Sequence, residues 1–138
     1  MSKSLALQKA LRAAFTASPA VLALVPAAHI VDRHLRPAPS PSVILGEETA
    51  GPDAGNVARD REELFHTLHI WQEEPGTVGV KAIMAALADC LTLDPRPILG
   101  GGYHLADWQI ASRRAFRDPD GKTAHGVLTI RAVIGGAA

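Results

Sequence analysis

The C-terminal part of the chain, Tyr103–Ile134, decides the fold class, and it reads YHLADWQIASRRAFRDPDGKTAHGVLTIRAVI. Two long strand patterns, Tyr103–Phe116 and Ala124–Ile134, flank the tetrapeptide Asp118–Gly121. This tetrapeptide, DPDG, is typical of a turn, because Asp starts a turn, Pro presets φ and Gly accepts a positive φ. The pattern therefore predicts a β-hairpin.

A further strand and the clearest helix lie immediately upstream of this hairpin. Glu63–Gln72 alternates with period two, and both of its faces carry substantial side chains. One face holds Leu64, His66, Leu68 and Ile70, and the other holds Phe65, Thr67, His69 and Trp71. After the turn Glu73–Gly76, apolar residues recur at helical spacing. They are Val80, Ile83, Met84, Leu87, Cys90 and Leu91.

The N-terminal half contains two more helix patterns and weaker strand patterns. Ser4–Thr16 carries one apolar stripe at helical spacing. Ser18 and Pro19 then suit the N-cap and first turn of a short helix that ends near Val25. The other expectations are a short strand at His29–Asp32, irregular backbone at Arg36–Pro41, a strand at Ser42–Thr49 and a mobile loop at Ala50–Asp60.

The order of these elements predicts one α+β domain over residues 1–138. It has an antiparallel or mixed β-sheet with two main helices packed on one face. A chain of 138 residues has the usual size of a single domain, and 47% hydrophobic residues suffice for one packed core.

Composition narrows the functional classes. Lys plus Arg and Asp plus Glu each total 14, and this balance argues against a dedicated DNA-binding protein. Cys90 is the only cysteine, so no intramolecular disulfide forms. No stretch approaches the roughly 20 apolar residues that span a bilayer, and polar residues interrupt any secretory signal pattern near the N-terminus. We therefore expect synthesis in the cytoplasm and no membrane partner.

Tests for local chemistry give no catalytic, cofactor-binding or metal-binding residues. On a strand, His66 and His69 point to opposite faces and cannot chelate one ion together. Gly121-Lys122-Thr123 lacks the glycine that a phosphate-binding loop has five residues earlier, because Phe116 stands there. We therefore expect no enzyme, no cofactor and no metal. A site assembled from distant residues would leave no local pattern, so a small ligand-binding domain stays an alternative.

Arg113, Arg114 and Arg117 form a basic cluster near the predicted hairpin turn. One interpretation is a solvated edge that discourages pairing between strands of different molecules. The other is a contact surface for an acidic partner or for DNA that passes nearby. The sequence leaves the role of this cluster open.

Seven segments, taken in chain order, form a recognisable set: LQKALRAAF at 7–15, AVLALV at 20–25, PSVILGEET at 41–49, LHIW at 68–71, VKAI at 80–83, FRDPDG at 116–121 and HGVLTIR at 125–131. This set resembles the tail completion, or tail terminator, proteins of long-tailed phages and gene transfer agents. The resemblance covers nearly the whole chain, and one departure is Pro26–His29, where relatives often have a Gly-rich turn.

The resemblance implies a structural virion protein with a tail-terminator-like fold. Such a protein forms a homohexameric ring that caps the head-proximal end of the tail tube, stops tube growth and joins the tail to the head. Its expected partners are further copies of itself, the major tail tube protein and a head-completion or adaptor protein of the neck. DNA would pass through the ring without sequence-specific binding. Another neck component is the alternative: a helix-dominated fold would favour an adaptor, whereas a sheet with a long C-terminal hairpin favours a terminator.

Overall fold

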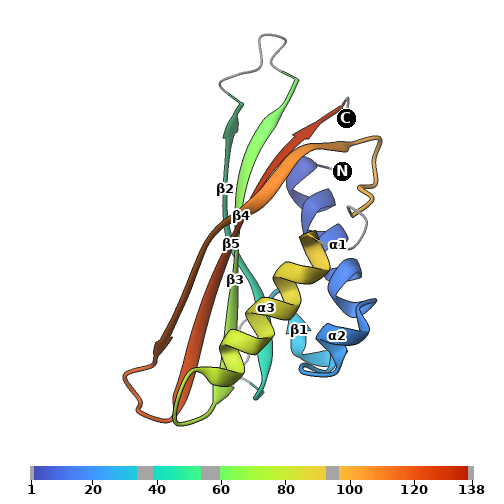
Figure 1. Cartoon of the computed structure of the whole chain (residues 1–138). Coiled ribbons are helices and arrows are strands. Elements are labelled where there is room, and N and C mark those ends of the chain that lie inside the picture. The colour runs from blue at the N-terminus through green and yellow to red at the C-terminus, as the bar shows by residue number, and fades with distance from the viewer. Residues whose placement is uncertain (1, 34–38, 54–59, 93–96, 137–138) are drawn as a thin grey trace.

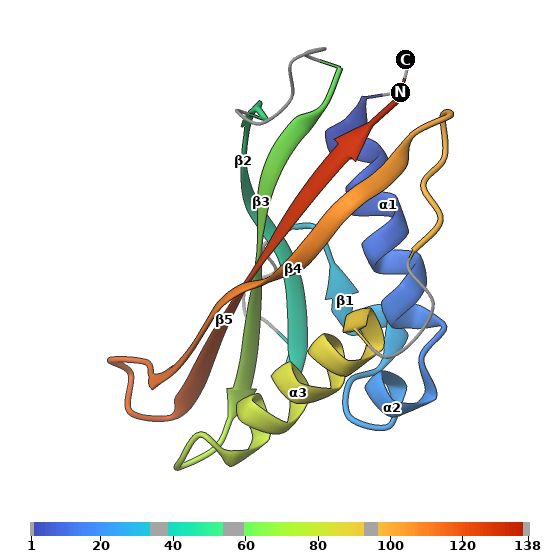
Figure 2. The same cartoon turned by 45° about the horizontal axis from the view of Figure 1, so that its top comes forward.

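Three helices cover one face of a five-stranded mixed sheet, and within the described residues no helix covers the other face (Figure 1). The computed structural model describes residues 2–33, 39–53, 60–92 and 97–136. Both views show the helices on the same side of the sheet, so the subunit has one covered face and one open face (Figures 1 and 2). The predicted α+β class and the predicted one-sided arrangement are confirmed.

The sheet has the strand order β1-β2-β3-β5-β4. Its strands are β1 (Ile30–Val31), β2 (Ser42–Pro52), β3 (Glu62–Glu73), β4 (His104–Arg117) and β5 (Thr123–Gly135). The pair β1–β2 is parallel, whereas β2–β3, β3–β5 and β5–β4 are antiparallel. β3 and β5 are therefore the central strands, and β4 is an edge strand.

The predicted hairpin is confirmed as β4–β5. Gly121 has φ +74°, a conformation that side chains rarely tolerate. The Asp120 carboxylate accepts hydrogen bonds from the Lys122 and Thr123 N–H groups at 2.8 and 2.9 Å. These bonds, that of Lys122 first, lower the pKa of Asp120 below its usual value. Turn formation alone thus accounts for these residues.

Three α-helices match the three helical patterns of the sequence, and the second begins at its predicted cap. They are α1 (Lys3–Thr16), α2 (Pro19–Leu22) and α3 (Val78–Thr92). Ser18 caps α2 through Val21 N–H. Glu74 accepts from the N–H groups of Gly79 and Val80 at the start of α3. The expected end of the second helix near Val25 is too late: α2 ends at Leu22, and a short 3₁₀ helix, η1 (Ala27–His29), leads into β1.

The core lies between the helices and the covered face. Leu68 of β3 and Leu128 of β5 are completely buried there, and every residue of the predicted α3 stripe is buried. α3 packs closely on β5 at Gly126, since a Cβ there would lie 3.1 Å from the Met84 sulfur, tighter than most real contacts. Burial of this face supplies the main stabilising free energy of the fold.

Two strand boundaries differ from the prediction. The expected loop Ala50–Asp60 is wrong at its start, because β2 continues through Pro52 and pairs with β3 as far as Glu62. Pairing with a long partner strand outweighs the poor strand propensity of Gly51 and Pro52. Residues 54–59 lie outside the described residues. The strand expected at His29–Asp32 is reduced to β1.

Candidate functional site

A cluster of ring side chains occupies the open face of the sheet. We call Glu47, His69, Trp71, Phe116 and His125 the open-face cluster. It draws on four strands, since β2, β3, β4 and β5 each contribute to it. The sheet register places its central members side by side, because His125 is opposite both Trp71 and Phe116. Their chain neighbours Leu68, Ile70 and Ala124 point the other way, into the core.

His125 lies at the centre of the open-face cluster. Its ring stacks on Trp71 with centroids 3.7 Å apart and an interplanar angle of 12°, and Phe116 meets it edge-on at 4.8 Å. Its Nε2 lies 2.9 Å from Nδ1 of His69, and Nε2 of His69 lies 2.7 Å from Glu47. A carboxylate only accepts, so His69 donates from Nε2 to Glu47, and a further hydrogen bond joins its Nδ1 to Nε2 of His125.

Gly46 provides the space for this arrangement. A Cβ at Gly46 would lie 2.8 Å from Cδ2 of His69, closer than real contacts allow. The register of β2 against β3 shifts between Leu45 and Glu48, which is typical of a β-bulge. The bulge and the missing side chain together let the His69 ring lie over β2 and reach Glu47.

Burial and hydrogen bonding shift the pKa values of two members of the open-face cluster, His125 and Glu47. Burial lowers the pKa of His125 to about 4, and the nearby His69 adds to this shift. The hydrogen bond from His69 lowers the pKa of Glu47. Stacked rings favour contact with another protein surface, since aromatic side chains are enriched at protein interfaces.

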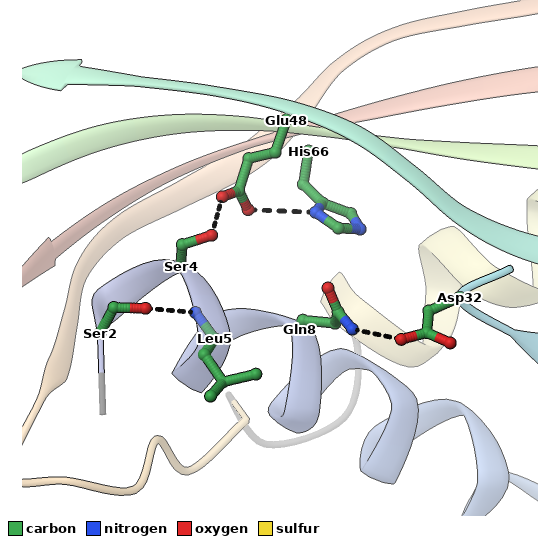
Figure 3. Close-up of polar contacts among 7 residues, drawn as sticks. All are labelled: Ser2, Ser4, Leu5, Gln8, Asp32, Glu48 and His66. Atoms are coloured by element: carbon green, nitrogen blue, oxygen red, sulfur yellow. Dashed lines mark hydrogen bonds and ion pairs between the residues drawn. The ribbon is translucent and has the colours of Figure 1, made fainter.

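A second polar group lies on the covered face and ties α1 to the sheet (Figure 3). His66 is 1% exposed, and its Nδ1 donates to Glu48 at 3.1 Å. The Ser4 hydroxyl donates to the other oxygen of Glu48. This order differs from a hydrolase triad, in which the serine hydroxyl contacts the histidine. Gln8 of α1 also donates to Asp32, directly after β1. We assign both contacts to the docking of α1.

The sequence placed His66 and His69 on opposite faces, and this prediction is confirmed by the contacts above. Within the described parts of the chain, no group of three His, Cys, Asp or Glu residues is arranged to hold a metal ion. Cys90 is buried, as its position on the helical stripe predicted, with Sγ 3.5 Å from the Ala14 carbonyl oxygen. That no metal or cofactor binds is still a prediction.

Arg113, Arg114 and Arg117 are exposed on β4. The edge position of β4 and its two register shifts fit the interpretation that this strand resists pairing with other molecules. Arg113, Arg114 and Lys81 of α3 also line a shallow hollow of about 260 Å³. The Arg114 guanidinium lies 5.1 Å from the centre of the Phe116 ring, so the basic cluster adjoins the open-face cluster.

Sequence reasoning did not find the open-face cluster. Its residues come from four strands, and their contacts depend on register and on the bulge at Gly46. The only local signal was the second substantial face of β3, which suggested that both faces of this strand are partly covered.

None of the described helices is long and apolar enough to cross a membrane.

Comparison with known families decides the assignment. The family model "Tail completion protein gp17" matches residues 9–135. The chain belongs to the tail completion protein gp17 family. Members of this family are structural proteins of phage tails, so the chain is a structural virion protein that acts at the end of a tail, and it is not an enzyme. Among curated protein sequences, the comparison finds no match.

Two solved structures share the fold. A chain in the virion of a native gene transfer agent particle superimposes with a TM-score of 0.79 and 24% identity, covering 96% of this chain and 97% of that one. The gp17 protein of bacteriophage SPP1 gives a TM-score of 0.60 and 20% identity, covering 94% and 88%. A sheet-based subunit with a long C-terminal hairpin thus fits the tail completion fold rather than a helix-dominated adaptor.

Proposed function

We propose that the chain forms a homohexameric ring that caps the head-proximal end of the tail tube. The ring stops growth of the tube and provides the surface that joins the tail to the head. The observation that carries this proposal is the match to the tail completion family over residues 9–135. The two dissimilar outer surfaces of the subunit support it, because head-to-tail contacts between unlike surfaces can close into a ring.

The proposed partners are the major tail tube protein on one side and a head-completion or adaptor protein of the neck on the other. DNA passes through the ring without sequence-specific contacts, and the formal net charge of zero is consistent with weak attraction to phosphates. The particle is a phage or a gene transfer agent. The superposition on a virion chain of a gene transfer agent covers nearly all of both chains, and this supports a gene transfer agent.

Electron microscopy of particles from producing cells that lack the chain tests this function. We expect tubes of uncontrolled length and filled heads without tails, because nothing would stop tube growth or complete the joint. Supplying the wild-type chain from a plasmid should restore tails of uniform length. Tails of normal length attached to heads in its absence would contradict the proposal.

A further inference from the structure

The outer surface of the helical layer contains a patch without charge. No Asp, Glu, Lys or Arg occurs from Ala13 to Ala28, a segment that includes the end of α1, all of α2 and the start of η1. Two large apolar side chains in it are prominent, since Leu22 is 39% and Leu24 is 42% exposed. We define the helical patch by its exposed residues Ala13, Ala17, Ala20, Leu22, Ala23 and Leu24. Exposed apolar surface of this kind marks an interaction site in soluble proteins.

The open face is the other unusual surface. It holds Phe65, Trp71 and Phe116, which are three of only six Phe, Trp and Tyr residues in the chain. Its main charged group is internally neutralised, because Arg131 donates to Glu63 at 2.7 Å and to Asp107 at 3.1 Å. Concentrated aromatic residues and compensated charges are the features of a surface that is desolvated on binding.

We propose that the open face of one subunit packs against the helical patch of the next copy of this chain. The inference rests on the ring in the proposed function and assigns the two surfaces that build it. The two surfaces lie on opposite sides of the subunit, with the helices on one side of the sheet and the open face on the other (Figure 2). Contacts between opposite sides lead from copy to copy in one direction, as a closed ring requires.

The physical match between the two surfaces favours a second copy over other occupants. A sheet with helices on one face gains a second helical layer, which is a common and stable arrangement. The helical patch carries no charged side chain, and on the open face Arg131 is already paired with Glu63 and Asp107, so these three charges keep their partners in the contact. Nucleic acid is disfavoured as the occupant, since the helical patch offers no cation for phosphates.

Complementing variants test this contact. Leu24→Glu introduces a charge into the helical patch, and Thr129→Lys introduces one at the middle of the open face, where Thr129 pairs with Thr67. Ile98→Glu is the matched control, because Ile98 is 93% exposed and lies outside both surfaces. Circular dichroism checks that each variant folds. If Leu24→Glu fails to fold, Leu22→Glu replaces it, and if Thr129→Lys fails to fold, Thr67→Lys replaces it.

Sedimentation at concentrations up to about 1 mM gives the readout, because even weak contacts are populated there. We expect multimers for the wild type and for Ile98→Glu, and monomers for Leu24→Glu and for Thr129→Lys. An equal mixture of these two variants should form one-to-one dimers. Leu24→Glu keeps an intact open face, and Thr129→Lys keeps an intact helical patch.

Three results would overturn the inference. Association of either variant as strong as that of the wild type would show that its surface is not the contact. Monomeric variants that fail to pair when mixed would exclude contact between unlike surfaces. A wild-type chain that stays monomeric at about 1 mM would exclude a self-contact of this kind. Tail length in cells that lack the chain is a separate readout, so the terminator function can stand when these surfaces fail.

Discussion

Two histidines on one strand, three residues apart, show how differently the two faces of this sheet are used. His66 lies on the covered face and donates to Glu48, and His69 lies on the open face and donates to Glu47. The same residue types therefore pair twice, from the same two strands. His66 is 1% exposed and bonded into the attachment of α1, whereas Glu47 of the other pair is 68% exposed.

The comparison teaches that strand alternation and helix cover, rather than residue type, determine the role of each pair. Beneath the helices, Nδ1 of His66 is paired with Glu48 in the core, where an unpaired polar group costs free energy. On the open face, Glu47 bonds His69, which in turn contacts His125. The covered face should thus control stability, and the open face should control association.

The largest expected effect comes from truncating the covered face. Leu68→Ala should lower the free energy of unfolding by about 2–5 kcal/mol, because Leu68 is completely buried and its loss leaves a cavity. Thr67→Ala, at the neighbouring position on the open face, should change the free energy of unfolding by less than about 1 kcal/mol. Urea unfolding monitored by circular dichroism measures both. Similar losses in the two variants would show that the faces do not differ as described.

The two glutamates provide the second test. Glu48→Ala should destabilise the protein by about 1–3 kcal/mol, because it leaves buried His66 without its hydrogen-bond partner. Glu47→Ala should change stability by no more than about 0.5 kcal/mol, because Glu47 is mostly exposed. Thermal unfolding of the two variants, measured side by side, gives these two losses of stability. A more damaging Glu47→Ala would reverse the assignment of the faces.

Acid should weaken the open-face cluster. Because the pKa of His125 is lowered from 6.5 to about 4, the unfolded chain takes up this proton more readily than the folded chain between these values. The free energy of unfolding should therefore fall as the pH falls from about 6.5 to about 4, and change no further through this group below that. The charged groups acting on His125 are His69, Asp118, Arg114 and Glu47.

His125→Gln is the matched control for this pH dependence, because it removes the titrating group. The midpoint of thermal unfolding, measured between pH 7 and pH 4, should fall less steeply in the variant than in the wild type. Parallel pH profiles for the two proteins would contradict the described environment of His125.

The smallest expected effect is that of added metal. Because His66 and His69 lie on opposite faces, they cannot bind one ion together. Equimolar zinc should leave the midpoint of thermal unfolding unchanged, and elemental analysis of the purified protein should find no stoichiometric metal. Stoichiometric zinc would contradict this prediction.

Much of the fold follows from local patterns. The hairpin turn, the α3 stripe and the alternation of β3 each depend on residues adjacent in the chain, so periodicity and turn preferences identify them. The end of β2 escaped prediction because Gly51 and Pro52 resemble loop residues, and only pairing with β3 keeps them in a strand. The whole-chain resemblance, rather than any single motif, led to the family.

The open-face cluster depends on contacts that no local pattern encodes. His69 and His125 meet because β3 and β5 are neighbours in a particular register, and the bulge at Gly46 lets Glu47 join them. The same holds for Ser4, which reaches Glu48 from α1. Such contacts are properties of the assembled sheet, so no local pattern in the sequence indicated them.

Cryo-electron microscopy of the intact particle tests the central claim most directly. We predict six copies of the chain in one ring at the head-proximal end of the tail tube, with the open face of each copy covered by the helices of its neighbour. A single copy without ring contacts, or a location at the distal tip of the tail, would contradict the account.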